Sequence, residues 1–152
     1  MGMSDDLKRV WDLTAERPAG NLLTGHTAKV FAVATTVVEG RPVAVTSSYD
    51  KTVRVWDRAT GQPVGEPLTG NAYPVLAVAT GVVDGRPVAV AGGEDGAVRV
   101  WDLITRQQVG AELMFPDAVR ALAVTQDGRL LAAFGSQVAV LAAAHCQEPQ
   151  DS

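Results

Sequence analysis

The sequence has almost none of the residues that build disulfides, metal sites or catalytic centres. It holds one cysteine, Cys146, and two histidines, His26 and His145. A single cysteine excludes an intramolecular disulfide and points to a cytosolic protein. The phosphate-binding motifs GxGxxG and GxxxxGK[ST], the zinc motif HExxH and paired cysteines are all absent. We therefore predict a protein without catalytic residues, cofactor or metal.

Long hydrophobic runs and clusters of positive charge are also lacking. Hydrophobic residues make up 47% of the chain, yet no apolar run approaches the ~20 residues that a membrane helix needs. The first ten residues contain no apolar core of a signal peptide. The net charge of −4 comes without a Lys/Arg cluster, which argues against nucleic acid and anionic membranes as partners. We expect a cytoplasmic protein, and its excess of Arg over Lys fits a bacterial source.

A short motif that ends in Trp-Asp occurs three times. It reads KRVWD at residues 8–12 and VRVWD at residues 53–57 and 98–102. The three tryptophans are therefore 45 residues apart. A fixed period in the forties that ends in Trp-Asp is typical of the blades of a β-propeller.

A longer stretch is duplicated with the same period. Residues 82–90 match residues 37–45, with Glu39 changed to Asp84, and each acid-glycine pair favours a tight hairpin turn. No window has helical spacing of apolar residues over a useful length. We predict an all-β chain of four-stranded antiparallel blades. The strands predicted for the first complete unit are 30–36, 42–46, 52–57 and 64–69.

The two ends of the repeated region are less regular. Pro18 and Gly20 favour a turn over residues 15–21 that should break any strand. The last unit is shorter than the others and has Leu141 where the earlier units have tryptophan. The strands predicted for this last unit are 117–125, 129–134 and 137–142.

The order of Gly-His, Asp and Trp-Asp resembles the WD-repeat (WD40-type) family of β-propellers over roughly residues 7–142. The resemblance implies a hydrogen-bonded network of His, Ser or Thr, Asp and Trp inside each blade. The first repeat fills these positions with His26, Thr46 or Ser48, Asp50 and Trp56. In such a network buried polar groups satisfy one another, so we expect His26 to be structural rather than a catalytic base.

The later repeats depart from this family pattern. The second repeat keeps Asp95 and Trp101, but has Asn71 in place of the histidine and Ala91 or Gly93 in place of the hydroxyl. The third repeat has Pro116 and Leu141 at the histidine and tryptophan positions and has lost the turn aspartate. We expect the network to weaken from the first repeat to the third. Asp50 and Asp95 should cap the turn between the second and third strands of their blades.

The resemblance also implies how many blades the chain can build. The repeats lie near residues 13–57, 58–102 and 103–142, after a strand at 7–12 and before a tail at 143–152. With strands a to d counted outwards from the propeller centre, the chain supplies c and d, then two full sets, then a, b and c. That makes three blades with one c strand in excess, at either 7–12 or 137–142. Propellers have about four to eight blades, so three cannot close.

Two explanations remain open at this point: the chain is a piece of a longer propeller, or several copies complete one ring. We favour homo-oligomerisation, because the third repeat has diverged as a capping element would and open ends would expose apolar strands. Head-to-tail contacts that close give cyclic symmetry, so a dimer has six blades and a trimer nine. Each blade of a nine-bladed ring occupies about 40° around the ring axis, and each blade of a six-bladed ring occupies about 60°. The corresponding angles for seven and eight blades are about 51° and about 45°. The homotrimer is therefore preferred to the homodimer.

The family resemblance implies a non-catalytic scaffold that binds a protein or peptide. Binding in this fold generally uses the face where the d–a and b–c loops converge. Tyr and Arg, which often anchor interfaces, occur among the residues expected there. These residues are Lys29, Tyr49, Tyr73, Glu94, Phe115 and Arg120.

Two other functions stay open. One is a C-terminal regulatory or interaction segment of a larger bacterial kinase or NTPase that carries such repeats. The other is a propeller enzyme or small-molecule binder with its site in the central channel. The absence of clustered His, Asp and Glu on matching loops counts against the enzyme.

Overall fold

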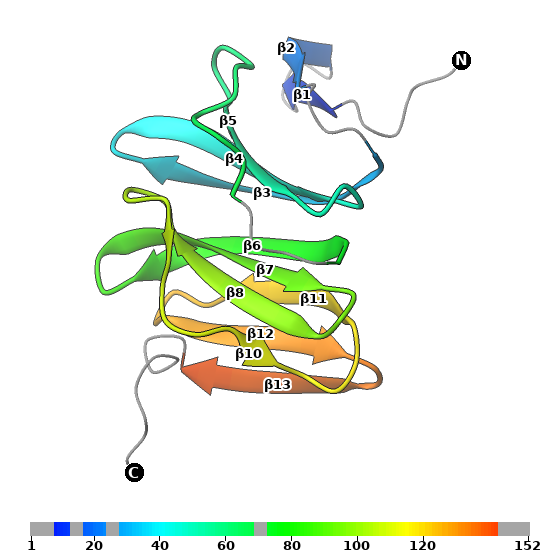
Figure 1. The fold of residues 1–152 in the computed structure, drawn as a ribbon. Coiled ribbons are helices and arrows are strands. Elements are labelled where there is room, and N and C mark those ends of the chain that lie inside the picture. Colours follow the sequence, from blue (N-terminus) through cyan, green and yellow to red (C-terminus); the bar gives the residue numbers. More distant parts are fainter. Residues whose placement is uncertain (1–7, 13–16, 24–27, 69–72, 143–152) are drawn as a thin grey trace.

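The computed structural model describes residues 8–12, 17–23, 28–68 and 73–142, and it consists of β-sheets stacked in layers (Figure 1). Within these residues strands are the only regular secondary structure, which confirms the predicted all-β class, and no helix occurs that could span a membrane. The strands are β1 (Lys8–Asp12), β2 (Arg17–Leu23), β3 (Val30–Val38), β4 (Arg41–Ser48), β5 (Val53–Asp57), β6 (Val75–Val83), β7 (Arg86–Gly93), β8 (Ala97–Asp102), β9 (Gln107–Gln108), β10 (Leu113–Met114), β11 (Val119–Val124), β12 (Arg129–Phe134) and β13 (Gln137–Ala142).

The sheets lie face to face like the blades of a propeller (Figure 1). Strands β3, β4 and β5 form blade 1, β6, β7 and β8 with β9 and β10 form blade 2, and β11, β12 and β13 form blade 3. β1 and β2 pair into a two-stranded sheet, the half-blade, beyond blade 1. The first strands of successive blades, β3, β6 and β11, lie next to one another. The first strands thus line one edge of the stack, and the strands within each blade pair antiparallel.

Two tight hairpin turns join the first and second strands of blades 1 and 2. Glu39 and Gly40 have φ angles of 51° and 81°, and Asp84 and Gly85 have φ angles of 53° and 77°. Positive φ at both central residues is the mark of a type I′ turn, whose twist suits a two-residue hairpin. The acid-glycine pairs of the sequence therefore form the turns that they predicted.

Blades 1 and 2 repeat each other residue by residue. Val33 pairs with Thr46 in blade 1, and Val78 pairs with Ala91 in blade 2. Each of these residues lies 45 positions from its counterpart, so the sequence period is also the structural period. Leu141 of blade 3 pairs across from Leu130 at the position where tryptophan stands in the other blades.

The fourth strand of each complete blade is broken, so the continuous strand predicted at 64–69 is wrong. In blade 1 two isolated bridges join this segment to β5, and in blade 2 the short strands β9 and β10 pair with β8. Between the two bridged parts stand Gly65 and Gly110, with φ angles of 72° and 69°. A left-handed glycine lets the strand bulge away from its neighbour, which interrupts the ladder. The bridges of blade 1 are Trp56 with Pro63 and Val53 with Leu68.

The strand-breaking turn predicted at residues 15–21 is also wrong. β2 begins at Arg17 and runs through Pro18 and Gly20. Pro18 lies opposite Trp11 of β1, beyond a register shift in that strand. In a two-stranded sheet each strand is an edge, and at an edge the missing N–H of proline leaves no neighbouring carbonyl unpaired.

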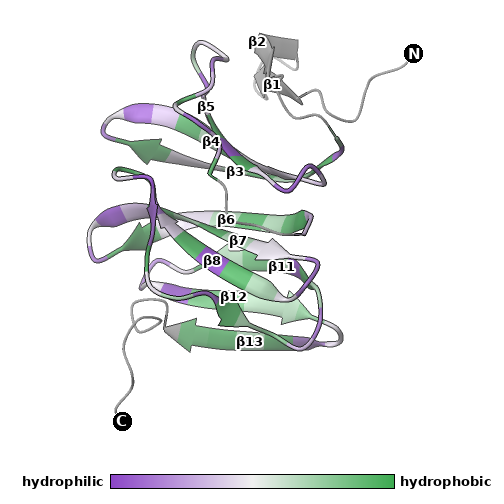
Figure 2. Ribbon diagram, in the orientation of Figure 1, coloured by the Kyte–Doolittle hydropathy of each residue, from purple (hydrophilic) through white to green (hydrophobic). Residues whose placement is uncertain are grey.

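The hydrophobic core lies between the blades in two layers. Valines of β4 and β5 pack against β6 and β7 between blades 1 and 2, and Trp101 joins this layer, so its indole faces the preceding blade. Valines of β7 and β8 pack against β12 between blades 2 and 3. Figure 2 shows the hydrophobic residues along these strands. Because the core is made between blades, no blade can bury its apolar faces without a neighbour.

Small and hydroxyl residues set how closely the blades approach. A Cβ atom added at Gly92 of β7 would lie 2.6 Å from Cγ1 of Val119 in blade 3. Between blades 1 and 2, the Thr80 hydroxyl donates a hydrogen bond of 2.6 Å to the Thr35 carbonyl. The close approach of blades 2 and 3 therefore requires glycine at position 92, and the Thr80 hydrogen bond joins the first strands of blades 1 and 2.

Candidate functional site

A buried hydrogen bond joins the second and third strands of blade 1. Nε1 of Trp56 donates to Oγ1 of Thr46 over 2.9 Å, and both side chains are buried. The Ser48 hydroxyl instead donates to the Lys29 carbonyl at 2.7 Å and accepts the Asp50 N–H at 3.0 Å. Of the two hydroxyls expected in the network, Thr46 is therefore the one that meets the indole. His26 lies outside the described residues.

Blade 2 lacks this hydrogen bond. Ala91 occupies the place of Thr46, and the buried Nε1 of Trp101 has no hydrogen-bond partner among the described residues. Asp95 still caps its turn, because its Oδ1 accepts the Ala97 N–H at 3.2 Å. Asp50 does the same in blade 1 by accepting the Thr52 N–H at 3.0 Å. The aspartate-capped turn is thus present in both blades, whereas the tryptophan indole N–H has a hydrogen-bond acceptor in blade 1 and none among the described residues in blade 2.

The aspartate after each tryptophan caps the turn that follows the third strand. Asp57 and Asp102 each accept two backbone N–H groups on Oδ1, with equal distances in the two blades. The donors are Ala59 at 2.8 Å and Thr60 at 3.1 Å for Asp57, and Ile104 at 2.8 Å and Thr105 at 3.1 Å for Asp102. Sequence reasoning gave these two aspartates no role, although their repetition after each tryptophan was visible.

Each of these aspartates also meets an arginine from the first hairpin of its blade. Nε of Arg41 lies 3.4 Å from Oδ2 of Asp57, and Arg86 donates a hydrogen bond to Oδ2 of Asp102. Burial opposes ionisation of Asp102, but the Arg86 hydrogen bond and the two backbone N–H groups outweigh it, so its pKa is lower than usual. The charge of Asp102 therefore fastens two turns at the same end of blade 2.

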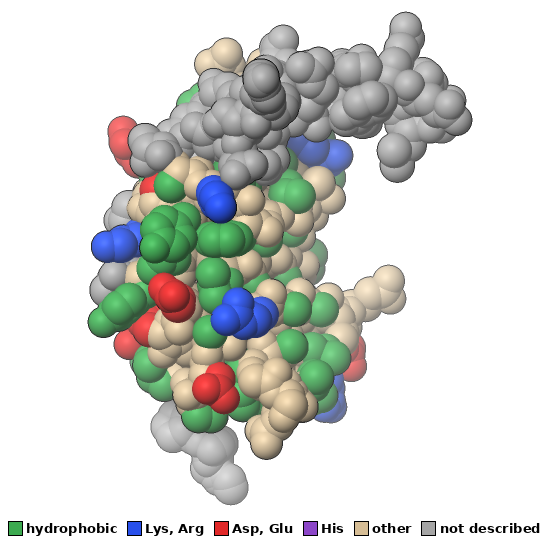
Figure 3. Space-filling model, turned by 90° about the vertical axis from the view of Figure 1, so that its right-hand side faces the viewer, with side chains coloured by type: hydrophobic (Ala, Val, Ile, Leu, Met, Phe, Trp, Pro, Cys, Tyr) green, Lys and Arg blue, Asp and Glu red, His purple; other side chains and the backbone are tan. Residues whose placement is uncertain are grey.

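The residues predicted to face a partner gather at the opposite end of the blades, which we call the loop face. In blade 1 the Tyr49 N–H donates to the Lys29 carbonyl at 2.9 Å, and in blade 2 the Glu94 N–H donates to the carbonyl of Pro74, the residue after Tyr73, at 3.0 Å. Hydrophobic side chains lie on this face with single acidic and basic side chains among them (Figure 3). The exposed members of the predicted set are Lys29, Tyr49, Tyr73, Glu94 and Arg120.

Phe115 is placed differently from the rest of that set. Its ring lies 4.8 Å from the ring of buried Phe134, measured between centroids, and it packs against the core layer between blades 2 and 3. Its N–H donates to the Gly96 carbonyl at 2.8 Å. Phe115 therefore belongs to the core rather than to the loop face, because the broken fourth strand carries it back over the end of β12.

The 45-residue period, the capped Trp-Asp turns and the Trp56–Thr46 hydrogen bond agree with one family. The family model described as "WD domain, G-beta repeat" (WD40) matches residues 18–57 and 61–102, which together make up more than half of the chain. The chain belongs to the WD40 repeat family. WD40 domains generally act as non-catalytic scaffolds that mediate protein–protein interactions. Comparison with curated proteins gives no match.

The WD40 loop face contains one aromatic residue that sequence reasoning missed. The ring centroids of Phe31 and Tyr49 lie 6.2 Å apart, and both side chains are exposed. Phe31 stands near the start of β3, where alternate residues point away from blade 2. In the sequence it looks like part of an apolar core strand, and only the period-two alternation within β3 could have placed it outside.

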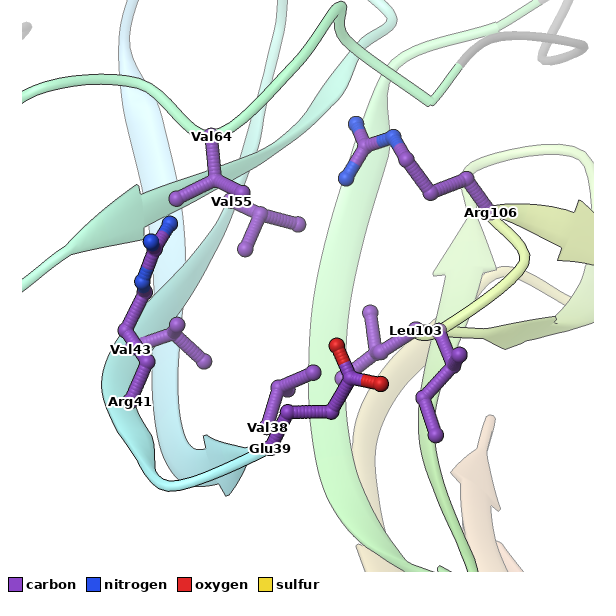
Figure 4. A pocket seen from close by; sticks show the side chains of 9 residues that line it. Val38, Glu39, Arg41, Val43, Val55, Val64, Leu103 and Arg106 are labelled. Carbon is purple, nitrogen blue, oxygen red and sulfur yellow. The ribbon is translucent and has the colours of Figure 1, made fainter.

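WD40 blades 1 and 2 also line an open pocket of about 240 Å³ at the end opposite the loop face. Its wall is aliphatic, with Val43 and Leu103 from the two blades, and Glu39, Arg41 and Arg106 stand around it (Figure 4). Arg106 donates to the Glu66 carbonyl, and burial lowers its pKa against the effect of the nearby Glu66 charge. Such a pocket could hold an aliphatic group. Among the described residues no cluster of His, Cys, Asp and Glu could hold a metal ion.

Proposed function

We propose that this chain is a non-catalytic WD40 module that closes into a ring with further copies of itself and presents the loop face to a protein or peptide. The observation that carries the proposal is the construction of the loop face. Exposed Tyr49 and Tyr73 lie on this face, and Lys29 and Arg120 are exposed there as well. Exposed aromatic and arginine side chains on a rigid sheet scaffold are the kind of residue that anchors a protein interface.

The loop face can be tested with substitutions that leave the blades intact. Tyr49→Ala and Tyr73→Ala remove exposed rings outside the surfaces between chains, so each should weaken binding of a partner recovered from the host cytoplasm by about tenfold without unfolding the chain. Ile104→Ala is the matched control, because Ile104 is also exposed but lies on the turn after β8, at the opposite end. Equal binding by all three variants would refute the assignment of the loop face.

The number of blades supports the proposed ring. The chain provides three blades and a half-blade, whereas propellers of about four to eight blades close. Homotrimers with nine blades are preferred to homodimers with six, because the angle that each blade occupies around the ring axis then differs less from the angle in common propellers. Light scattering coupled to size exclusion on untagged protein should give a single species at two or three times 15.9 kDa.

A monomer in that measurement would favour the other reading, in which the chain is a C-terminal interaction segment of a larger kinase or NTPase. A series of ever larger species would also count against a closed ring. As part of the same proposal, the protein works in the cytoplasm of a bacterium, which its single cysteine and its excess of arginine over lysine support.

A further inference from the structure

Blade 3 ends the stack with two apolar side chains that project into solvent. Val138 and Val140 of β13 are 65% and 56% exposed. By the shared pairing register, their counterparts in blade 2 are Val98 and Val100, which are 0% and 7% exposed. Val98 and Val100 are buried because blade 3 covers them. The two valines of β13 thus stand where a following blade would cover them.

The same exposed face extends over the two other strands of blade 3. Ala121 and Ala123 of β11 are exposed, whereas their counterparts Ala77 and Ala79 in blade 2 are buried. Residues of all three strands line a shallow apolar depression of about 130 Å³. We call this surface the blade-3 end face. It consists of Ala121, Ala123, Leu131, Ala133, Val138 and Val140.

At the other end of the stack, blade 1 exposes apolar side chains that a preceding blade would cover. Val33 of β3 is 55% exposed, whereas its counterpart Val78 is 7% exposed because it packs against blade 1. Phe31 on the same strand is exposed as well. Ala44 and Trp56, on the second and third strands of blade 1, are buried. The surface that lacks a cover is therefore the outer side of the first strand, and Phe31 and Val33 form the blade-1 end face.

The two ends are complementary in their strands as well as in their apolar side chains. The half-blade before blade 1 has two strands and carries the Trp-Asp motif of a third strand, so within the described residues it contains no first or second strand. Blade 3 has its first, second and third strands, and in the described residues the outer edge of β13 pairs with no other strand. Among the described strands, blade 3 thus contains the first and second strands that are missing from the half-blade, and the half-blade contains the fourth strand that is missing from blade 3.

We infer that the blade-3 end face is the docking surface for a second copy of this chain, which seats its blade-1 end face there. The contact repeats between chains the packing that blades 1, 2 and 3 make within one chain. It brings the fourth strand of the second copy, β2, alongside β13, so β1 is the third strand in excess. Such a head-to-tail contact uses two different surfaces and closes when the ring is complete. This inference rests on the proposed self-assembly and names the surfaces that produce it.

The test blocks each end face separately in the full-length chain. Val138→Lys places a charge in the blade-3 end face, and Val33→Lys places one in the blade-1 end face. Both residues are largely exposed in one chain, so neither substitution disturbs the fold. Val82→Lys is the control, since Val82 is a valine of similar exposure, 53%, on blade 2 and outside both end faces. Circular dichroism and the thermal midpoint show that each variant folds.

We expect Val138→Lys and Val33→Lys each to be monomeric at concentrations where the wild type and Val82→Lys are assembled. An equimolar mixture of the two blocked variants should form a species of two chains and no larger one. One unblocked pair of end faces remains in the mixture, whereas the lysines repel each other across the other pair.

Two outcomes would overturn the inference: either blocked variant keeps the wild-type mass, or the mixture stays monomeric. A monomeric wild type contradicts both this inference and the proposed ring. A wild type that forms open-ended species, together with a two-chain mixture, contradicts the ring alone and supports the docking surfaces.

Discussion

The missing hydrogen bond of blade 2 leads to a prediction about stability. Trp101 carries a buried indole N–H without a partner among the described residues, whereas its counterpart Trp56 donates to Thr46. Ala91 occupies the place of Thr46 in the same pairing register, so Ala91→Thr should bring a hydroxyl within reach of the Trp101 indole. The substitution should therefore stabilise the folded chain relative to a variant of the same shape without the hydroxyl.

The size of the effect follows from the cost of burying an unpaired donor. Leaving such a group unsatisfied costs about 1–3 kcal/mol. The new side chain also adds two heavy atoms to the core layer between blades 1 and 2, and overpacking there costs about 1–3 kcal/mol. Ala91→Val carries the same steric cost and no hydroxyl. We therefore expect Ala91→Thr to exceed Ala91→Val in unfolding free energy by about 1–2 kcal/mol.

Urea unfolding followed by tryptophan fluorescence measures this difference at a fixed protein concentration, since assembly makes apparent stability concentration-dependent. The reverse pair, Thr46→Val against wild type, should lose about 1–3 kcal/mol in blade 1. Hydrogen exchange of the Trp101 indole proton should slow in Ala91→Thr and stay unchanged in Ala91→Val. Equal stability of the two variants, with equal indole exchange, would refute the reasoning.

Two further predictions concern the contacts between blades and the capped turns. Gly92→Ala should lower the stability of the fold by about 1–3 kcal/mol, because its Cβ would lie 2.6 Å from Val119 Cγ1. Ser47→Ala at the counterpart position of blade 1 should have little effect, since the buried Ser47 hydroxyl has no partner among the described residues. Thermal unfolding compares the two variants. The lowered pKa of Asp102 means that its charge stabilises the fold above the ordinary aspartate pKa. That contribution is lost as the pH falls through the lower folded-state value, so Asp102→Asn should flatten the acid side of a stability-against-pH curve, and an unchanged curve would contradict the role of the cap.

The parts of the fold that local sequence determines could be predicted from the residues alone. The acid-glycine pairs specify hairpin turns through their tolerance of positive φ, and the repeated Trp-Asp motif marks the end of the third strand. The cap that the aspartate places on the next turn was recognised only in the structure. The broken fourth strand could not be predicted in this way. Its valine and leucine have the composition of a strand, and the bulge depends on a left-handed Gly65 whose φ the composition does not fix.

The candidate site divides along the same line. Tyr49 and Tyr73 follow directly from their places in the turns, and both are exposed at the loop face. Phe115 was predicted on the loop face, whereas Phe31 was not assigned to it. Both outcomes have a physical reason, since an aromatic side chain at the end of a strand can turn either into the core or onto the surface. Which way it turns depends on the neighbouring strand, so the contact between Phe115 and Phe134 is a property of the tertiary structure.

The two faces of the third repeat lead to different interpretations of its divergence from the other repeats. Its divergence suggested a cap, and a capping repeat should have a polar outer face. In the structure the inner face of β13 has changed, with Leu141 in place of tryptophan, whereas the outer face keeps the two valines of β8 as Val138 and Val140. An exposed pair of valines next to a strand edge that pairs with no other described strand makes an isolated chain prone to association. A polar cap would avoid that association, so the outer face of blade 3 has the composition of an interior blade contact rather than that of an end.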